Sequence, residues 1–300
     1  MPSGGVRRSC AIWMRLVRNQ RLLRGPYLRG TSATPQSRHS RLYPALHGYT
    51  RLPAGWLRPP CRSAHYRYHG RTMGTEIFFA GDCHGRFEHV IEACEAYGPK
   101  ALILLGDMES PAPLDQVLAP ILPLTQVWWI PGNHDTDSEN PHDNLWGSGL
   151  ADHNLHGRVV EIAGVRFAGL GGVFRGKVWA PPAAPLYKSA EDFTHRCGKG
   201  NRWRGGLPLK HRSSIFPDVY GRLLHQRADV LVCHEAPATH RNGFLALGEL
   251  AHRLGVRIML HGHHHEHYEA QLDGGIKVMG VGLRGIVDLD GQVVVPGEAA

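Results

Sequence analysis

Five short apolar segments between residues 76 and 260 constrain the fold of this chain more than any other feature. They are Glu76 to Ala80, Ala101 to Leu105, Gln126 to Ile130, Asp229 to Val232 and Ile258 to Leu260. A helical pattern follows the first segment, with Phe87, Val90, Ile91 and Cys94 on one face. Strands without polar alternation are buried on both faces, and strand–helix–strand units form parallel sheets. The sequence therefore predicts an α/β fold that binds ligands beyond the carboxyl ends of its strands.

A hairpin is predicted in the middle of the chain. Strand-like segments at 159–162 and 165–170 flank the turn Ala163-Gly164, and we expect this hairpin to lead into a second sheet. From Ile276 to Val295, short strands alternate with Gly and Asp turns.

Motifs of Asp, Asn and His residues stand where the predicted strands end. In chain order they are Gly81-Asp82-Cys83-His84-Gly85, Gly106-Asp107, Gly132-Asn133-His134-Asp135, Cys233-His234-Glu235 and Gly262-His263-His264-His265. Such side chains supply oxygen and nitrogen ligands for two adjacent metal ions, and paired ions are how proteins hydrolyse phosphate esters with water. Each motif alone is weak, but the ordered set is highly specific.

The motif residues divide naturally between two ions. Asp107 is the natural bridge, because a carboxylate has two oxygens. The residues that can complete the first ion are Asp82, His84 and His265. Those that can complete the second ion are Asn133, His234 and His263. His134 is left over beside Asp135, and the ligand set suits Mn, Fe, Zn, Ni or Co alike.

The motif series Asp-x-His, Gly-Asp, Gly-Asn-His-Asp, His and Gly-His-x-His resembles the calcineurin-like metallophosphoesterase superfamily over nearly all of residues 74–280. The resemblance implies a four-layer α/β/β/α sandwich of two mixed sheets, with a dimetal site at the carboxyl ends of the strands. It implies the same division of ligands, with Asp107 shared, and a metal-bridging hydroxide that attacks phosphorus in line. By the family pattern, His134 stabilises the transition state or protonates the leaving oxygen, oriented by Asp135.

Departures from subfamily patterns narrow the resemblance. The run Gly106 to Glu109 lacks the Asp-Arg-Gly continuation of the protein serine/threonine phosphatases, whereas the Gly-His-x-His ending resembles phosphodiesterase, nuclease and small-phosphatase branches. We therefore predict hydrolysis of a phosphomonoester or phosphodiester. Two alternatives stay open: a single-strand nuclease, and a non-catalytic metal-binding scaffold. Scaffold members of the family typically lack the histidine that here is His134, which favours an enzyme.

Basic residues near the motifs are candidates for substrate binding. Arg86 directly follows the first motif and could reach a phosphate oxygen or lie at an exposed helix start. Arg202 and Arg204 belong to a basic stretch around Trp203, which is either a solvated loop or a flap over the site. Three other histidines are expected to be structural, namely His153, His156 and His195. Strand alternation would place His263 and His265 on one side and His264 away from the metals.

Residues 1–72 differ from the rest, with 14 Arg, no Lys and no acidic residue. Removing these 14 from 34 basic residues leaves 20 against 26 acidic ones, so residues 73–300 carry a net charge of −6. We predict that 1–72 is a disordered extension or a misplaced start, and that 73–300 is the metallophosphoesterase domain. An organelle transit peptide and a basic arm for nucleic acid or an anionic membrane are the alternatives.

The acidic body argues against a broad nucleic-acid surface, so nucleic acid is expected only as substrate or through residues 1–72. Sparse cysteines without a Cys-x-x-Cys pair favour a reducing compartment. No apolar run is long enough for a membrane span or a secretory signal. We therefore expect a cytoplasmic protein, or an organelle-targeted one if 1–72 is a transit peptide. The oligomeric state cannot be read from the sequence.

Overall fold

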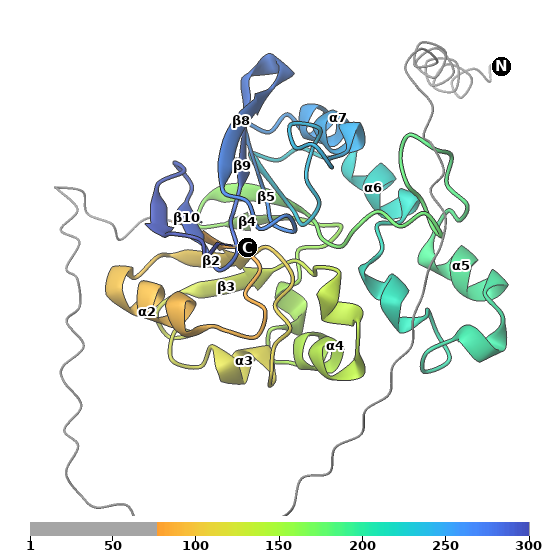
Figure 1. The fold of residues 1–300 in the computed structure, drawn as a ribbon, viewed down its shortest axis with the longest axis horizontal. Coiled ribbons are helices and arrows are strands. Elements are labelled where there is room, and N and C mark those ends of the chain that lie inside the picture. The colour runs from red at the N-terminus through yellow and green to blue at the C-terminus, as the bar shows by residue number, and fades with distance from the viewer. Residues whose placement is uncertain (1–76, 300) are drawn as a thin grey trace, which may run out of the picture. The chain divides into compact units, whose positions relative to one another are not determined.

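A computed structural model describes residues 77–299 of the chain (Figure 1). The predictions made for residues 1–72 lie outside the described residues.

The first sheet contains the three predicted parallel strands. They are β1 (Ile77–Ala80), β2 (Ala101–Leu104) and β3 (Gln126–Trp129), which pair in parallel and in this order. Two strands from the end of the chain, β10 (Ile286–Asp288) and β11 (Val293–Val295), add antiparallel neighbours beside β1. The sheet is therefore mixed, and the carboxyl ends of β1, β2 and β3 lie at one edge.

The second sheet begins with the predicted hairpin. It consists of β4 (Val159–Ile162) and β5 (Val165–Leu170), joined by Ala163 and Gly164, which both have positive φ. The remaining strands are β6 (Val230–Cys233), β7 (Ile258–His261), β8 (Tyr268–Leu272) and β9 (Ile276–Gly280). The order is β4-β5-β6-β7-β9-β8, with β5, β6, β7 and β9 parallel and both edge strands antiparallel.

Helices cover the outer faces of the two sheets (Figure 1). The α-helices are α2 (Glu88–Tyr97), α3 (Leu114–Val117), α4 (Glu139–Trp146), α5 (Ala190–Arg196), α6 (Pro217–Leu223) and α7 (Leu245–Leu254). The 3-10 helices are η2 (His134–Thr136), η3 (Ala151–His153), η4 (Lys199–Asn201), η5 (Leu209–Ser213) and η6 (Asp273–Gly275).

Alternation along the buried strands assigns their side chains to three hydrophobic clusters. In β1, Phe78 packs in the cluster that contains helix α2, whereas Phe79 points between the sheets and meets Phe167 of β5 at 6.0 Å between ring centroids. In β6, Leu231 belongs to the cluster of α6 and α7, and Val232 to the layer between the sheets. This arrangement confirms the four-layer α/β/β/α prediction.

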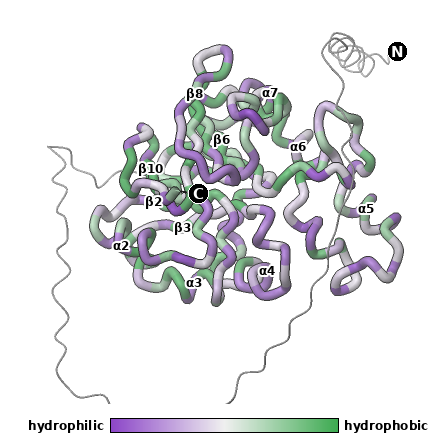
Figure 2. Tube along the Cα trace, in the orientation of Figure 1, coloured by the Kyte–Doolittle hydropathy of each residue, from purple (hydrophilic) through white to green (hydrophobic). Residues whose placement is uncertain are grey.

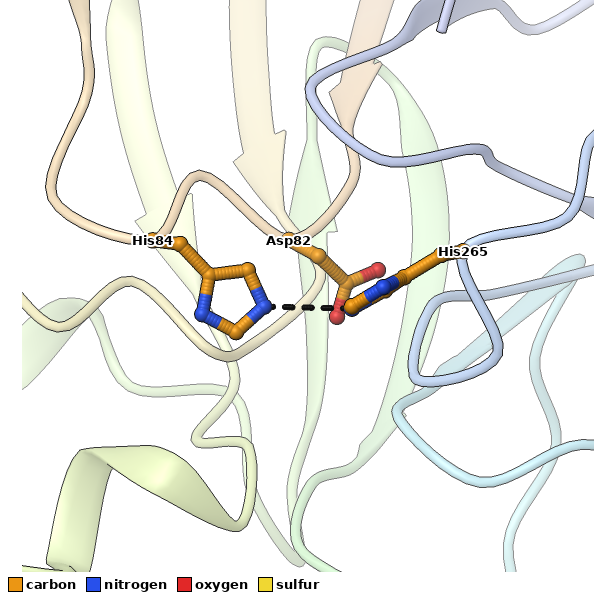
Figure 3. A group of neighbouring side chains, drawn as sticks. All are labelled: Asp82, His84 and His265. Carbon is orange, nitrogen blue, oxygen red and sulfur yellow. Dashed lines mark hydrogen bonds between the residues drawn. The ribbon is translucent and has the colours of Figure 1, made fainter. Parts of the chain in front are cut away.

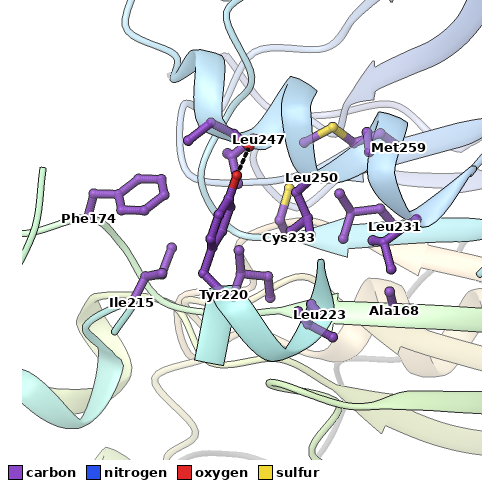
Figure 4. Packing of buried hydrophobic residues seen from close by; sticks show 14 of the residues in the cluster. Ala168, Phe174, Ile215, Tyr220, Leu223, Leu231, Cys233, Leu247, Leu250 and Met259 are labelled. Carbon is purple, nitrogen blue, oxygen red and sulfur yellow. Dashed lines mark hydrogen bonds between the residues drawn. The ribbon is translucent and has the colours of Figure 1, made fainter. Parts of the chain in front are cut away.

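The hydropathy of the chain follows these layers. Figure 2 shows the hydrophobic stretches along the central strands and the hydrophilic ones in the outer loops. Figure 4 shows the cluster under α6 and α7, where the Tyr220 hydroxyl donates a hydrogen bond to the Ala246 carbonyl at 2.8 Å. Within residues 77–299, no helix combines the length and apolar character needed to cross a membrane.

Candidate metal centre

Two groups of donor side chains meet where the strands of both sheets end. The first consists of Asp82 and His84, from the loop after β1, and His265, from the loop after β7 (Figure 3). Their ligand atoms lie within 4.8 Å of one another, and the Nε2 atoms of His84 and His265 are 3.1 Å apart. These loops are separated by 181 positions in the chain, so the fold brings the group together.

The second group consists of Asp107, after β2, with His234 and His263, after β6 and β7. Their ligand atoms also lie within 4.8 Å of one another. The Nε2 atom of His234 is 3.3 Å from Asp107 Oδ2 and 3.2 Å from Asn133 Oδ1. His234 Nδ1 faces the Leu105 carbonyl at 2.8 Å, so Nε2 is the nitrogen that points to the other donors.

The spacing of these donor atoms fits metal ligation. Metal–ligand bonds of about 2.0–2.2 Å place neighbouring ligands roughly 2.8–3.6 Å apart in tetrahedral or octahedral sites. The separations of 3.1, 3.2 and 3.3 Å fall in this range. Carboxylate, amide and imidazole donors in two adjacent groups therefore fit two divalent ions.

Five of the seven predicted ligands have positive φ. They are Asp82 (31°), His84 (43°), Asp107 (46°), His263 (72°) and His265 (58°). Such conformations cost about 1–3 kcal/mol each in non-glycine residues and concentrate at functional sites. The expected strand alternation of His263 and His265 was wrong, because both are left-handed rather than extended. They belong to different donor groups, while His264 stacks on His240 at 3.9 Å.

Backbone groups hold the two carboxylates in place. The His263 N–H lies 3.0 Å from both oxygens of Asp82, and the His134 N–H donates to Asp107 Oδ1 at 2.7 Å. The neighbouring motif glycines leave room for this approach. A Cβ at Gly132 would lie 2.2 Å from Asp107 Oδ1, and one at Gly262 would lie 2.7 Å from Asp82 Oδ2. Any larger residue at either position would displace a predicted ligand.

Burial shapes the charge of the site. Burial raises the pKa of Asp82 to about 7, helped by Asp107 and opposed by His234. Burial also favours neutral Asp107, but the His234 imidazolium and the His134 N–H hold the Asp107 pKa below its usual range. Burial lowers the pKa of His234, but the carboxylates of Asp107 and Asp82 outweigh burial and raise this pKa to about 10. Ligands lose their protons when a metal binds, so metal binding here is expected to release protons.

His134 stands beside the donor groups with a side chain 46% exposed. Its ring lies 5.6 Å from that of His84, and its Nδ1 atom is 2.7 Å from Asp137 Oδ2. Burial lowers the pKa of His134, but Asp107 and the hydrogen bond to Asp137 outweigh it and raise that pKa overall. The contacts with Asp107 and Asp137 therefore favour the protonated form of the imidazole.

The expectation that Asp135 orients His134 needs correction. The buried Asp135 carboxylate accepts hydrogen bonds from the backbone N–H groups of Gly132 and Glu109, both at 2.8 Å. It thus joins the loops after β2 and β3, and Asp137 is the carboxylate that contacts the His134 ring. The chain enters a 3-10 turn at His134, which brings residue i+3 back to the ring.

Two acidic residues of the site had not been singled out in the sequence. Glu109 Oε2 lies 2.5 Å from His84 Nδ1, and carboxylates in this position orient histidine ligands and make them more basic. Glu235 Oε1 lies 3.6 Å from His263 Nε2, and burial raises the pKa of Glu235 to about 7. Both residues were visible next to the motifs, but only the fold shows what they face.

The remaining motif neighbours have structural roles. Cys83 and Cys233 are buried, and burial raises the pKa of both thiols, which favours packed thiols over thiolate ligands. The three histidines expected to be structural belong to neither donor group. His153 Nδ1 lies 2.6 Å from the Val127 carbonyl, His195 Nδ1 lies 3.0 Å from the Glu191 carbonyl, and burial lowers the pKa of His156 to about 4.

The basic residues proposed to bind substrate are placed differently from one another. Arg204 is held by α4, because its guanidinium donates to both Asp143 oxygens, at 2.8 and 2.7 Å, and to Glu139 at 3.1 Å. Arg202 donates through Nε to the Thr194 carbonyl at 3.1 Å. These contacts favour a loop fastened to the protein surface, and substrate binding by Arg202 and Arg204 stays a prediction. Arg86 is exposed directly after the first donor loop.

We expect Arg204→Ala to leave the KM for a small phosphoester within about twofold of wild type. The melting temperature should fall by about 1–4 °C, since exposed ion pairs contribute roughly 0.2–1 kcal/mol each. Kinetics and thermal unfolding of the variant check this. Arg222→Ala, which removes another exposed pair with Asp218, is the matched control. A tenfold rise in KM at an unchanged melting temperature would return Arg204 to substrate binding.

Comparison with known proteins identifies relatives of most of the described chain. A family model described as calcineurin-like phosphoesterase matches residues 75–267. An uncharacterized protein of Haemophilus influenzae is 41% identical over 216 residues, covering 72% of this chain and 95% of that protein. The crystal structure of TT1561 of Thermus thermophilus is 15% identical, with a TM-score of 0.46 over 72% of this chain and 95% of that one. Phosphopantetheinyl hydrolase from Mycobacterium tuberculosis is 15% identical, with a TM-score of 0.40 over 71% of this chain and 91% of that one. The two structural similarities are too distant to indicate a substrate.

Proposed function

This chain belongs to the calcineurin-like phosphoesterase family, and from this membership we propose that it hydrolyses a phosphomonoester or phosphodiester at a site for two divalent metal ions. One observation carries the proposal. Two groups of three donor residues, each with ligand atoms within 4.8 Å of one another, lie side by side at the carboxyl ends of the strands. The short His234–Asp107 contact belongs to one group, and His234 Nδ1 lies 3.9 Å from Asp82 of the other.

In this proposal, seven side chains hold the ions. Asp82, His84 and His265 would hold the first ion, and Asn133, His234 and His263 would hold the second. Asp107 has one oxygen near His234, and its two carboxylate oxygens would allow it to serve both ions. Two bound ions would lower the pKa of a water molecule and offset the negative charge on the phosphoryl oxygens. Oxygen and nitrogen donors accept Mn, Fe, Zn, Ni or Co, so availability decides which is bound.

His134 acts on the leaving group. Its imidazole is half exposed, is held by Asp137 at 2.7 Å and has a raised pKa. A protonated Nε2 can therefore donate to the ester oxygen as the phosphorus–oxygen bond breaks, while Asp137 stabilises the cationic ring. Asp135 supports this residue through the backbone of the same loop.

A substrate panel tests the proposal. Protein loaded in turn with Mn, Zn or Ni is expected to hydrolyse p-nitrophenyl phosphate or bis-p-nitrophenyl phosphate, with about two ions per chain by elemental analysis. Chelation should remove the activity, and adding metal back should restore it.

One other outcome would contradict the proposal, and another would restrict its substrate to nucleic acid. Stoichiometric metal without turnover of any mono- or diester would indicate an interaction scaffold. Cleavage of single-stranded oligonucleotides at low salt, without cleavage of the small esters, would indicate a nuclease.

A further inference from the structure

One arginine near the site is used neither by the proposed metal ligands nor by a carboxylate partner. Arg175 lies in the segment after β5, and its Nη2 atom donates to Ser213 Oγ at 3.2 Å. Its Nε atom is buried without a protein acceptor among residues 77–299. Buried arginine nitrogens are nearly always hydrogen-bonded, so this Nε–H group is available to donate to an oxygen of a ligand.

The fold fastens the segment of Arg175 to the loop that carries Asn133 and His134. The Gly172 N–H donates to the Pro131 carbonyl at 2.6 Å, and a Cβ at Gly172 would lie 2.3 Å from the Ser213 carbonyl. Ser213 Oγ in turn lies 2.6 Å from Thr136 Oγ1 in the turn after His134. Arg175 and the proposed general acid therefore belong to one connected unit.

The preceding residue sets the direction of Arg175. Phe174 is buried in the cluster under α6 and α7 (Figure 4). Its ring lies 4.7 Å from that of Phe244 and 5.2 Å from that of Trp179. Val173 forms an isolated parallel β-bridge with Ser214. With Phe174 anchored in the core, Arg175 is directed away from this cluster and toward Ser213.

The charges that act on Arg175 come from the site. Burial lowers the pKa of Arg175, and the groups that oppose this are Asp137, Asp107 and Glu235. These three residues contact, respectively, His134, His234 and His263. The Arg175 guanidinium therefore lies within electrostatic range of the carboxylates that surround the donor groups.

We propose that Arg175 is a substrate-binding residue that donates hydrogen bonds to a terminal phosphoryl oxygen, and that it selects phosphomonoesters over diesters. This inference rests on the proposed function. A monoester has three terminal oxygens and two negative charges, whereas a diester has two terminal oxygens and one charge. A fixed guanidinium beside two metal ions adds a third positive contact, which the third oxygen of a monoester can use.

Binding of inorganic phosphate to metal-loaded protein tests the role of Arg175 without turnover. Arg175→Gln should weaken phosphate binding by about tenfold or more while two ions per chain and the melting temperature are kept. Arg175→Lys should recover part of this affinity, because it restores the charge but not the planar fork. Arg222→Gln, an exposed arginine paired with Asp218, is the control and should bind phosphate as wild type does.

Kinetics test the substrate class. Arg175→Gln should lower kcat/KM by about tenfold or more for p-nitrophenyl phosphate and by less than about threefold for bis-p-nitrophenyl phosphate. Equal losses on both esters would overturn the selection for monoesters. Phosphate affinity within twofold of wild type, or loss of metal from Arg175→Gln, would overturn the binding role.

The two proposals fail in different ways. If the wild-type protein turns over no ester, and the Arg175→Gln variant binds phosphate more weakly than wild type, the proposed function fails and the anion-binding role of Arg175 stands. If wild-type protein is active and Arg175→Gln binds phosphate normally, only the role of Arg175 fails.

Discussion

Asp107→Asn is expected to lower turnover by roughly a thousandfold or more and to reduce the metal content of both donor groups. An asparagine offers one neutral oxygen where the aspartate offers two anionic ones. Metal ions stabilise the transition state by several kcal/mol, and about 1.4 kcal/mol corresponds to a tenfold change in rate. The amide would also turn an N–H group toward either the His134 N–H or His234 Nε2, which now face Asp107 at 2.7 and 3.3 Å. The substitution would therefore disturb both metal ligation by Asp107 and its contacts with His134 and His234.

Metal analysis and single-turnover rates on the same preparation check this expectation. Asp152→Asn is the matched control, because Asp152 is exposed and lies outside both donor groups. Circular dichroism and thermal unfolding show whether the variant is folded. Near-normal metal content with a near-normal rate would remove Asp107 from the bridging role.

His134→Ala is expected to separate catalysis from metal binding. The variant should keep two ions per chain but turn over at least about a hundredfold more slowly, the usual contribution of a general acid or an oxyanion donor. The reason is geometric: the His134 ring contacts Asp137 and faces the ring of His84, but its side chain belongs to neither donor group. Loss of metal would instead make His134 a ligand.

Two further variants sharpen this result. Asp137→Asn should slow turnover less than His134→Ala and leave metal binding unchanged, because Asp137 contacts the imidazole of His134 and belongs to neither donor group. A leaving group of low pKa needs little protonation, so His134→Ala should be less damaging for a nitrophenyl ester than for an alkyl ester. His195→Ala, which alters an exposed histidine of α5, serves as the control.

Much of the fold could be predicted because its strands are buried on both faces. The segments before Asp82, Asp107 and Asn133 contain almost no polar residue, and such runs are compatible with a parallel sheet that helices cover. The carboxyl ends of parallel strands lie at one edge, so motifs far apart in the chain were expected to meet there. The donor types and their order were then enough to indicate the reaction class.

Other features were decided by tertiary contacts that leave no local pattern. The family pattern pointed to Asp135 as the residue that orients His134, but the 3-10 turn buries Asp135 against two backbone N–H groups and places Asp137 beside the ring. A basic composition pointed to Arg204, but α4 supplies two carboxylates that hold it. In the first case a residue three positions along the chain contacts the ring, and in the second case a helix 61 positions away holds the side chain.

Residue type and order along the chain therefore determined the architecture, the donor set and the class of chemistry. Tertiary structure alone decided where single charged side chains lie, as with Arg175 after β5, which belongs to no motif, follows the buried Phe174 and donates to Ser213. The physical reason is the range of the interactions. Hydrophobic periodicity is a local property that repeats along a strand or helix, whereas the direction of a single polar side chain depends on a few hydrogen bonds to groups tens of positions away.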